Sequence, residues 1–312
     1  MFLALATAVA ACGGRGIRPD AASCRAASVD PAALRAHVDA LVTRFSPRDF
    51  EHPENLARAA DFLAASLRAT GAAVSEQAFR AGDRSYRNVL AELGPDTPER
   101  IVVGAHYDTA GDQPGADDDA SGIAGLLELA RLLAASPPPL RVVLAAYANE
   151  EPPSFGSERM GSFVHARALA SAGARVRLMI SLEMIGAFSD AKGSQRYPPV
   201  VGWWHPSTAS FVAVVGKWGQ GDVVDAVAQA MHAGSPLPVE TLTAPTFLEG
   251  VDFSDHRSFW AQGYDAVMVT DTAFLRNARY HTPGDLPDTL DYGLMAEVVK
   301  GVHCAVRAAA GP

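Results

Sequence analysis

Histidines and carboxylates stand at the ends of several short apolar segments of this 312-residue chain. The segments are rich in Val, Ile, Leu and Ala, which is typical of strands buried on both faces. The polar residues that follow them, or that open a loop beside them, are His106, Asp108, Asp117, Asp118, Asp119, Glu150, Glu151, Glu183 and His281. Because ligands of open α/β sheets gather at the carboxyl ends of the strands, we expect these side chains to lie close together. Imidazole nitrogens and carboxylate oxygens are ligands that suit Zn²⁺.

Each motif taken alone has an ordinary structural explanation. A His-x-Asp pair such as His106 and Asp108 is usually a hydrogen-bonded histidine, and an acidic run is usually a solvated turn. Glu150 and Glu151 differ because they end an apolar segment, where unpaired carboxylates are costly to bury. The order of the whole set and its strand context therefore favour one shared metal centre.

Apolar periodicity predicts the elements that position these residues. Helical spacing runs through residues 34–45, 56–67, 123–130, 162–172, 207–218, 222–232 and 292–310. Strand-like segments cover residues 73–79, 86–93, 101–106, 142–148, 176–182, 200–204 and 264–270. Because strands and helices alternate, the sequence predicts an α/β fold with three layers, α/β/α, around a central mixed, mostly parallel sheet.

The N-terminal residues form a separate segment. Residues 2–11 carry no charge and have the length of the apolar core of a signal peptide, too short to span a bilayer. Residues 9–12 look like a bacterial lipobox in which Cys12 is lipidated, although no Lys or Arg precedes the run. We expect residues 1–28 to be a signal or lipoprotein-like segment with a tether, and residues 29–312 to form a single domain. The protein is then exported to the periplasm or cell envelope, with membrane anchoring through lipidated Cys12.

Composition narrows the function further. The 48% of hydrophobic and 20% of charged residues are typical of a globular protein. The formal net charge of −9 disfavours nucleic acid as a partner, because a nucleic-acid-binding face would be basic. If Cys12 carries lipid, Cys24 and Cys304 are left of the three cysteines, and export would allow a disulfide between them.

Taken together, the motifs resemble those of zinc-dependent exopeptidases of the aminopeptidase Y type. That family includes bacterial double-zinc aminopeptidases, glutamate carboxypeptidase and glutaminyl cyclases. The matching stretches are Gly104-Ala105-His106-Tyr107-Asp108, residues 114–122, Asn149-Glu150-Glu151, Leu182-Glu183-Met184, Ser254-Asp255-His256 and Tyr280-His281-Thr282. With the flanking elements, the resemblance covers most of residues 30–310.

The resemblance implies a set of metal ligands. Asp118 would bridge two zinc ions, and the peptide bond between Asp118 and Asp119 would be cis. His106 and Glu183 would complete one site, and Glu151 and His281 would complete the other. Glu183 departs from the family pattern, in which this residue is usually an aspartate.

Two further residues take implied roles beside the metals. Glu150 would be the general base that accepts a proton from the attacking water. Asp108 would hydrogen-bond His106 and fix its tautomer, and the alternation of side chains along a strand supports this because the two residues are two positions apart. The resemblance also brings Asp255 and His256 near the pocket, and Arg276 and Asn277 are candidates for binding substrate termini.

The function implied is that of a zinc metallo-exopeptidase, with an aminopeptidase as the leading hypothesis. Its partner would be a peptide with a free N-terminus, and its cofactor two zinc ions per chain. One alternative is a glutaminyl-peptide cyclotransferase with a single zinc on the same fold. Another is a non-catalytic, receptor-like binding domain. Retention of all five ligands favours hydrolysis, since receptor-like relatives usually lose them.

Overall fold

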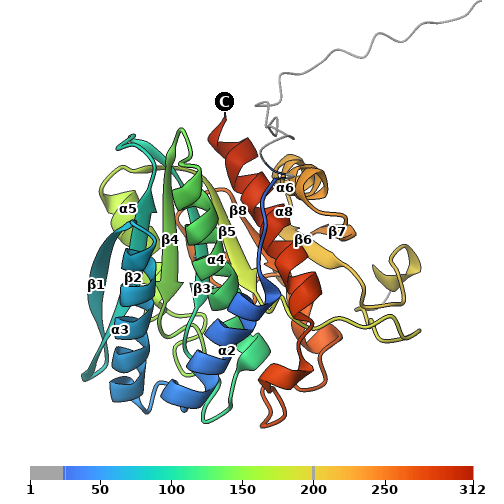
Figure 1. Cartoon of the computed structure of the whole chain (residues 1–312), viewed down its shortest axis with the longest axis horizontal. Coiled ribbons are helices and arrows are strands. Elements are labelled where there is room, and N and C mark those ends of the chain that lie inside the picture. The colour runs from blue at the N-terminus through green and yellow to red at the C-terminus, as the bar shows by residue number, and fades with distance from the viewer. Residues whose placement is uncertain (1–23, 25, 199–200, 312) are drawn as a thin grey trace, which may run out of the picture.

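A mixed sheet of eight strands runs through the computed structural model, which describes residues 24, 26–198 and 201–311 (Figure 1). Its strand order is β1–β2–β4–β3–β5–β8–β6–β7. The strands are β1 (Ala73–Ala81), β2 (Arg84–Leu93), β3 (Glu99–His106), β4 (Arg141–Tyr147), β5 (Arg175–Glu183), β6 (Val212–Lys217), β7 (Val239–Ala244) and β8 (Ala266–Thr270). The predicted α/β class with a mixed, mostly parallel sheet is confirmed.

Strands β4, β3, β5 and β8 are parallel neighbours in the middle of the sheet. On one side β2 pairs antiparallel with β4, and β1 pairs antiparallel with β2. On the other side β6 is antiparallel to β8, and β7 is parallel to β6. The carboxyl ends of the four central strands therefore lie along one edge of the sheet, where binding sites of such sheets form.

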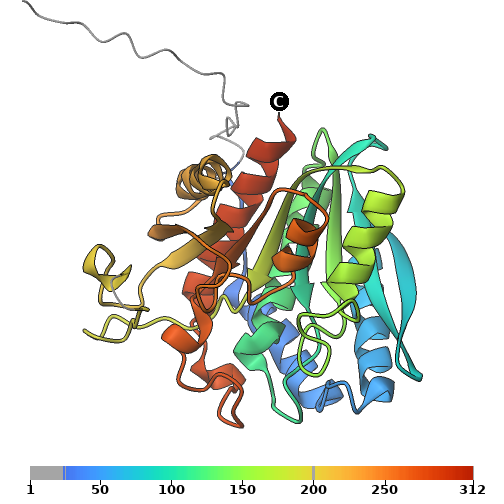
Figure 2. The same ribbon diagram turned by 180° about the vertical axis from the view of Figure 1, so that it is seen from behind.

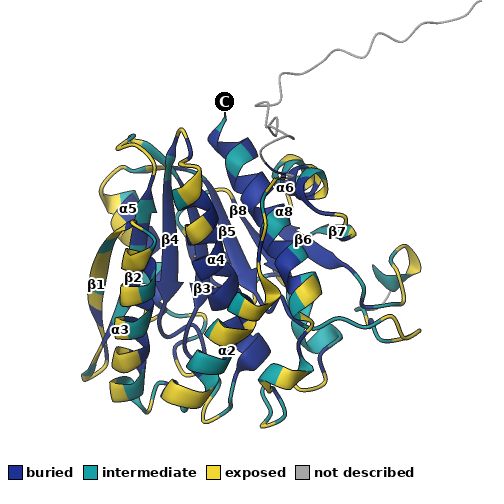
Figure 3. Ribbon diagram, in the orientation of Figure 1, coloured by how far each residue is buried: buried dark blue, intermediate teal, exposed yellow. Residues whose placement is uncertain are grey.

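Helices cover both faces of this sheet. The helices α2 (Pro31–Phe45), α3 (Pro53–Ala69), α4 (Gly122–Ala135), α6 (Gly221–Gly234) and α8 (Tyr292–Ala310) pack around the larger hydrophobic cluster, on the side that faces the viewer in Figure 1. The helices α5 (Gly161–Ser171) and α7 (His256–Ala261) cover the opposite face, seen in front in Figure 2. Exposed positions gather on the outer sides of the helices, and the central strands are buried (Figure 3). The three predicted layers are thus present.

A disulfide joins Cys24 to Cys304. Cys304 is buried on α8, so the bond ties the segment before α2 to the last helix. The predicted pairing of these two cysteines is confirmed. Cys12 and the predicted signal segment lie outside the described residues. Among the helices of the described part, none is both long and apolar enough to cross a membrane.

Two predictions for the region after residue 199 are wrong. Residues 207–218, predicted to be a helix, contain strand β6. The β-branched residues Val212, Val214 and Val215 favour a strand. All three are buried, however, and the spacing of apolar residues alone cannot distinguish a buried strand from a buried helix. Residues 200–204, predicted to be a strand, contain a 3₁₀ turn at Val201–Trp203, and Trp203 is 76% exposed. Strand β7 was not predicted.

Candidate metal centre

The ends of the central strands bring the predicted residues together. His106 is the last residue of β3 and pairs in register with Tyr147, the last residue of β4. Glu150 and Glu151 follow β4 after a short turn. Glu183 ends β5 and pairs with Thr270 at the end of β8, from which the chain continues to His281. Because β3 lies between β4 and β5, these side chains meet at one edge of the sheet.

Asp118 lies between the two histidines. Its Oδ1 is 3.3 Å from Nε2 of His106, and its Oδ2 is 3.0 Å from Nε2 of His281. Asp118 lies in a kinked turn, Ala116–Ser121, just before α4, where its backbone angles are not helical. Its peptide bond to Asp119 is cis, as predicted. The carboxylate therefore offers one oxygen to each side of the cluster.

Two groups of ligand atoms share Asp118. One is formed by His106, Asp118 and Glu183, and the other by Asp118, Glu151 and His281. Within each group the ligand atoms lie within 4.8 Å of one another. The composition of the two groups is that of the two predicted sites. The longer side chain of Glu183 reaches the cluster, with its Oε2 3.6 Å from Nε2 of His106.

Buried atoms of this cluster lack hydrogen-bond partners among the described residues. They are Nε2 of His106, Oδ2 of Asp118 and Oε2 of Glu183. Leaving such atoms unpaired costs roughly 1–3 kcal/mol each in a folded protein, and more when they are charged. Imidazole nitrogens and carboxylate oxygens gathered in this way are donors that fit zinc ions.

The electrostatics of the cluster also favour a cation. Burial raises the pKa of Glu151 to about 8, with Asp118 acting in the same direction and the hydrogen bond to His281 opposing it. Burial raises the pKa of Glu150 well above its ordinary value, against the influence of His106. For Asp118 burial acts upwards too, but His106 and His281 outweigh it and hold the pKa below its usual value. Burying several carboxylates together is unfavourable unless positive charge compensates them.

Asp108 takes a different partner from the one predicted. Its Oδ1 and Oδ2 accept hydrogen bonds from the backbone N–H groups of Glu150 and Glu151, both at 3.0 Å. Nδ1 of His106 instead donates to the backbone carbonyl of Asp108 at 3.2 Å, while the carboxylate is 3.6 Å away. Strand β3 ends at His106, so the alternation that supported the prediction does not extend to Asp108. The tautomer of His106 is still fixed, with Nε2 free to bind a metal.

Several buried residues that support the site were not predicted from the sequence. The Asp119 carboxylate accepts the backbone N–H groups of His106, Gly122 and Met184, which join β3, α4 and β5. The Asp285 carboxylate accepts those of Asp117 and Asp118. Asp119 belongs to the acidic run, and Asp285 follows His281 closely, but no sequence pattern assigned either residue a partner.

The four secondary candidates are buried or partly buried. Asp255 is fully buried, and burial raises the pKa of its carboxyl to about 7. His256 donates from Nε2 to the carbonyl of Val251 at 2.9 Å. Arg276 donates to backbone carbonyls, including that of Phe211 at 2.8 Å. Asn277 donates to Oδ2 of Asp117 at 2.7 Å and is buried. Arg276 and Asn277 thus serve internal contacts, and neither lines the cavity beside the metal centre.

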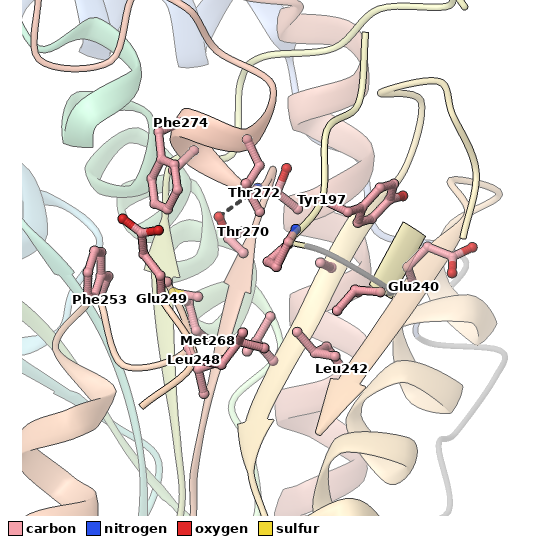
Figure 4. Close-up of a pocket in the computed structure, with 18 of the residues that line it drawn as sticks. Tyr197, Glu240, Leu242, Leu248, Glu249, Phe253, Met268, Thr270, Thr272 and Phe274 are labelled. Carbon is pink, nitrogen blue, oxygen red and sulfur yellow. Dashed lines mark hydrogen bonds between the residues drawn. The ribbon is translucent and has the colours of Figure 1, made fainter. Parts of the chain in front are cut away.

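A largely apolar pocket adjoins Glu183 (Figure 4). Four of the residues that line it lie side by side on neighbouring strands of the sheet. Glu183 pairs with Thr270, Thr270 pairs with Ala213, and Ala213 pairs with Glu240. The apolar side chains drawn around it include Leu242, Leu248, Phe253, Met268 and Phe274. An apolar lining of this kind suits an apolar side chain of a substrate.

Comparison with known proteins assigns the chain to a class. A model of peptidase family M28 matches residues 88–306, which is more than half of the chain. The chain belongs to peptidase family M28 and is a hydrolase of that class. Membership implies zinc as its metal, in agreement with the donor set.

Two curated relatives and two solved structures show the range of the similarity. The chain is 45% identical over 281 residues to the uncharacterized protein YfbL of Escherichia coli, covering 87% of this chain and 86% of that protein. It is 30% identical to a probable zinc metalloprotease of Pyricularia oryzae, covering 87% of this chain but only 62% of the relative. The LapA aminopeptidase of Legionella pneumophila has a similar fold, with a TM-score of 0.75, 20% identity and coverage of 93% of this chain and 74% of that one. So does a Bacteroides thetaiotaomicron glutaminyl cyclase, with a TM-score of 0.68, 22% identity and coverage of 90% and 98%.

Proposed function

We propose that this protein is a zinc aminopeptidase that removes N-terminal residues from peptides. The observation that carries the proposal is the position of Asp118, whose two carboxylate oxygens face His106 and His281 at 3.3 and 3.0 Å. A carboxylate shared in this way suits a centre of two ions, one held with His106 and Glu183 and the other with Glu151 and His281. When bound, zinc ions supply a water of lowered pKa and polarise the scissile carbonyl.

Glu150 is the general base in this proposal. It is 5% exposed, and its carboxylate lies within 4.8 Å of ligand atoms of both His106 and Glu151. It accepts the proton of the attacking water and passes it to the amine that leaves. Burial raises its pKa, which moves a carboxylate towards the range in which it can both accept and donate a proton near neutral pH. Asp108 holds the backbone of Glu150 and so orients the base.

The substrate is a peptide with a free N-terminus and an apolar first side chain. The cavity beside Glu183 supports the side-chain preference, since Leu242, Leu248 and Met268 line it. The carboxylates of Glu150 and Glu151 attract the positively charged α-amine. Blocking that amine removes the attraction, so N-acylated peptides are expected to be poor substrates.

A substrate panel tests this function. Metal-free protein is reloaded with Zn²⁺ and incubated with Leu-, Phe- and Glu-p-nitroanilide, N-acetyl-Leu-p-nitroanilide and a peptide beginning with Gln. Hydrolysis of the Leu and Phe compounds that depends on zinc, with little or none of the acetylated compound, supports an aminopeptidase. Absence of hydrolysis from every aminoacyl compound contradicts it.

The glutaminyl cyclase alternative is decided by the same panel. The similarity to a cyclase structure is at 22% identity and concerns the fold, which the aminopeptidases share. Two ligand groups around Asp118 favour hydrolysis over a reaction with a single zinc. Release of ammonia from the Gln peptide, without release of p-nitroaniline from the aminoacyl compounds, would establish the cyclase instead.

We also propose that the protein acts outside the cytoplasm, in the periplasm or cell envelope, with Cys12 as a lipid anchor. The disulfide between Cys24 and Cys304 supports export, because such bonds form and persist in oxidising compartments. Cell fractionation of the protein and of Cys12→Ala tests the proposal. Release of the variant from the membrane fraction supports anchoring, and an unchanged distribution contradicts it.

A further inference from the structure

Arg48 is a fully buried arginine beside the metal centre. All three guanidinium nitrogens donate hydrogen bonds, and four of the five acceptors are backbone carbonyls. The acceptors are the carbonyls of Tyr107, Leu41, Pro114 and Gly115, at 3.0 to 3.1 Å, and Oγ of Ser46 at 3.2 Å. Within the described residues, Arg48 has no ion pair with a carboxylate at salt-bridge distance.

Burying a positive charge without a carboxylate partner is costly, so the burial of Arg48 needs an explanation. Three of the four carbonyls that Arg48 contacts belong to the two segments that carry the proposed metal ligands, and the fourth, that of Leu41, belongs to α2. Tyr107 directly follows His106, and Gly115 lies three residues before Asp118. The backbone N–H of Thr109, between these two points, donates to the carbonyl of Arg48 at 3.1 Å. The guanidinium therefore spans the loop that connects His106 to Asp118.

The turn at Gly115 fits closely around this guanidinium. Gly115 has a φ of +59°, in the left-handed region that favours glycine. A Cβ at this position would lie 2.3 Å from the carbonyl oxygen of Asp118 and 3.1 Å from Nη2 of Arg48. The carbonyl of Asp118 and the guanidinium of Arg48 therefore both lie close to Gly115 and leave little space for a side chain there.

We propose that Arg48 is a positioning residue for the metal centre, and that it fixes the spacing between His106 and Asp118. It acts through hydrogen-bond geometry as well as charge, because a planar guanidinium presents five N–H donors in a rigid fork, whereas an ammonium has three donors on a single nitrogen. Arg48 has no hydrogen bond or ion pair, among the described residues, with Glu151 or His281, the proposed ligands that belong to the second group alone. Loss of Arg48 should therefore weaken the ion held with His106 more than the ion held with His281.

The test compares Arg48→Lys and Arg48→Met with a matched control, Arg276→Lys. Arg276 is also mostly buried and also donates to backbone carbonyls, those of Ala187, Ala209 and Phe211, but not to either segment that Arg48 holds. Zn²⁺ affinity is measured for each variant by competition with a chromophoric chelator. Co²⁺ absorption reports the coordination geometry, and the rise in Tm on adding Zn²⁺ to metal-free protein reports coupling to the fold.

We expect both Arg48 variants to lose at least about tenfold in affinity for one ion, in the range typical of residues that orient metal ligands. Their Co²⁺ spectrum should change and their zinc-induced rise in Tm should shrink, while Arg276→Lys keeps the wild-type values. Arg48→Lys that binds both ions as tightly as wild type, with the same spectrum, overturns the proposal. So does an Arg48 variant that fails to fold at saturating Zn²⁺ while Arg276→Lys folds, because Arg48 would then serve the whole fold.

The inference rests on the proposed metal centre, and the two fail in different ways. Wild-type protein that binds no Zn²⁺ contradicts the centre itself. Wild-type protein that binds Zn²⁺, with an Arg48→Lys variant that binds it equally well, leaves the centre intact and removes only the role of Arg48.

Discussion

The carboxylate of Asp108 accepts the backbone N–H of Glu150 at 3.0 Å, and its second oxygen accepts the next N–H, that of Glu151, at the same distance. The turn after β4 is thereby fixed relative to the end of β3. The proposed base and a proposed ligand of the second ion are both held by this one side chain. The side chain of Asp108 therefore orients the turn that carries both glutamates, and its backbone carbonyl accepts a hydrogen bond from His106.

Asp108→Asn should lower kcat by about 10–100-fold, the usual cost of losing a residue that orients a metal site. An asparagine has one acceptor oxygen, and its amide NH₂ would face the N–H of Glu150 or Glu151. Bound zinc should fall less than kcat, because no proposed ligand is removed. The measurements are kcat on Leu-p-nitroanilide and zinc content per chain. A kcat equal to that of wild type would show that the two hydrogen bonds do not matter to the turn.

His165 should make the protein less stable in acid. Its Nδ1 is hydrogen-bonded to the hydroxyl of Tyr147 at 2.9 Å, and burial lowers the pKa of the imidazole from 6.5 to about 4. Between pH 6.5 and 4 the unfolded chain therefore binds more protons at His165 than the folded chain does. The contribution of neutral His165 to the free energy of unfolding is thus fully present above pH 6.5 and is lost as the pH falls towards 4. The loss is on the order of 3 kcal/mol.

His165→Gln removes this titration and leaves a side chain that can accept the Tyr147 hydroxyl. Urea unfolding of wild type and variant at several pH values from 4 to 7 gives the difference in their free energies of unfolding. That difference should shrink towards low pH, because only wild type loses stability through His165. A difference that is constant across this range would contradict the assignment.

The disulfide should contribute to stability by restraining the unfolded chain. Cys24→Ser, Cys304→Ser and the double variant should each lose roughly 2–5 kcal/mol in the free energy of unfolding, with no additional loss in the double variant. Dithiothreitol should lower the stability of wild type to the same level and leave the variants unchanged. Two free thiols titrating in the mature, non-reduced protein would contradict the pairing.

The sequence predicted those parts of the centre that depend on local pattern. His106 and Glu183 end apolar runs that form parallel neighbours in the sheet, so the strand pattern alone placed them at one edge. The cis bond after Asp118 and the division of ligands into two groups came from the family resemblance. The metal-binding roles themselves remain predictions, since geometry shows proximity and donor type.

The residues that hold the proposed ligands in place could not be predicted from the local sequence pattern. Arg48 stands in a polar segment, Ser46-Pro47-Arg48-Asp49, that reads as surface, and it is buried only because α2 and the loop after β3 close over it. Asp285 depends on backbone N–H groups far away in the sequence. Strand β6 was misassigned because its buried valines satisfy both periodicities over so short a run.

Zinc content and turnover measured together in Glu150→Gln test the central claim most directly, with Glu151→Gln as the matched control. The two glutamates are neighbours, equally buried at 5% exposure, and the substitution is the same. We expect Glu150→Gln to retain the zinc of wild type and to lose about 10²–10⁴-fold in kcat, since it removes a base and no ligand. Glu151→Gln should lose zinc as well as activity. Equal loss of zinc from both variants, or wild-type turnover in Glu150→Gln, would contradict the account.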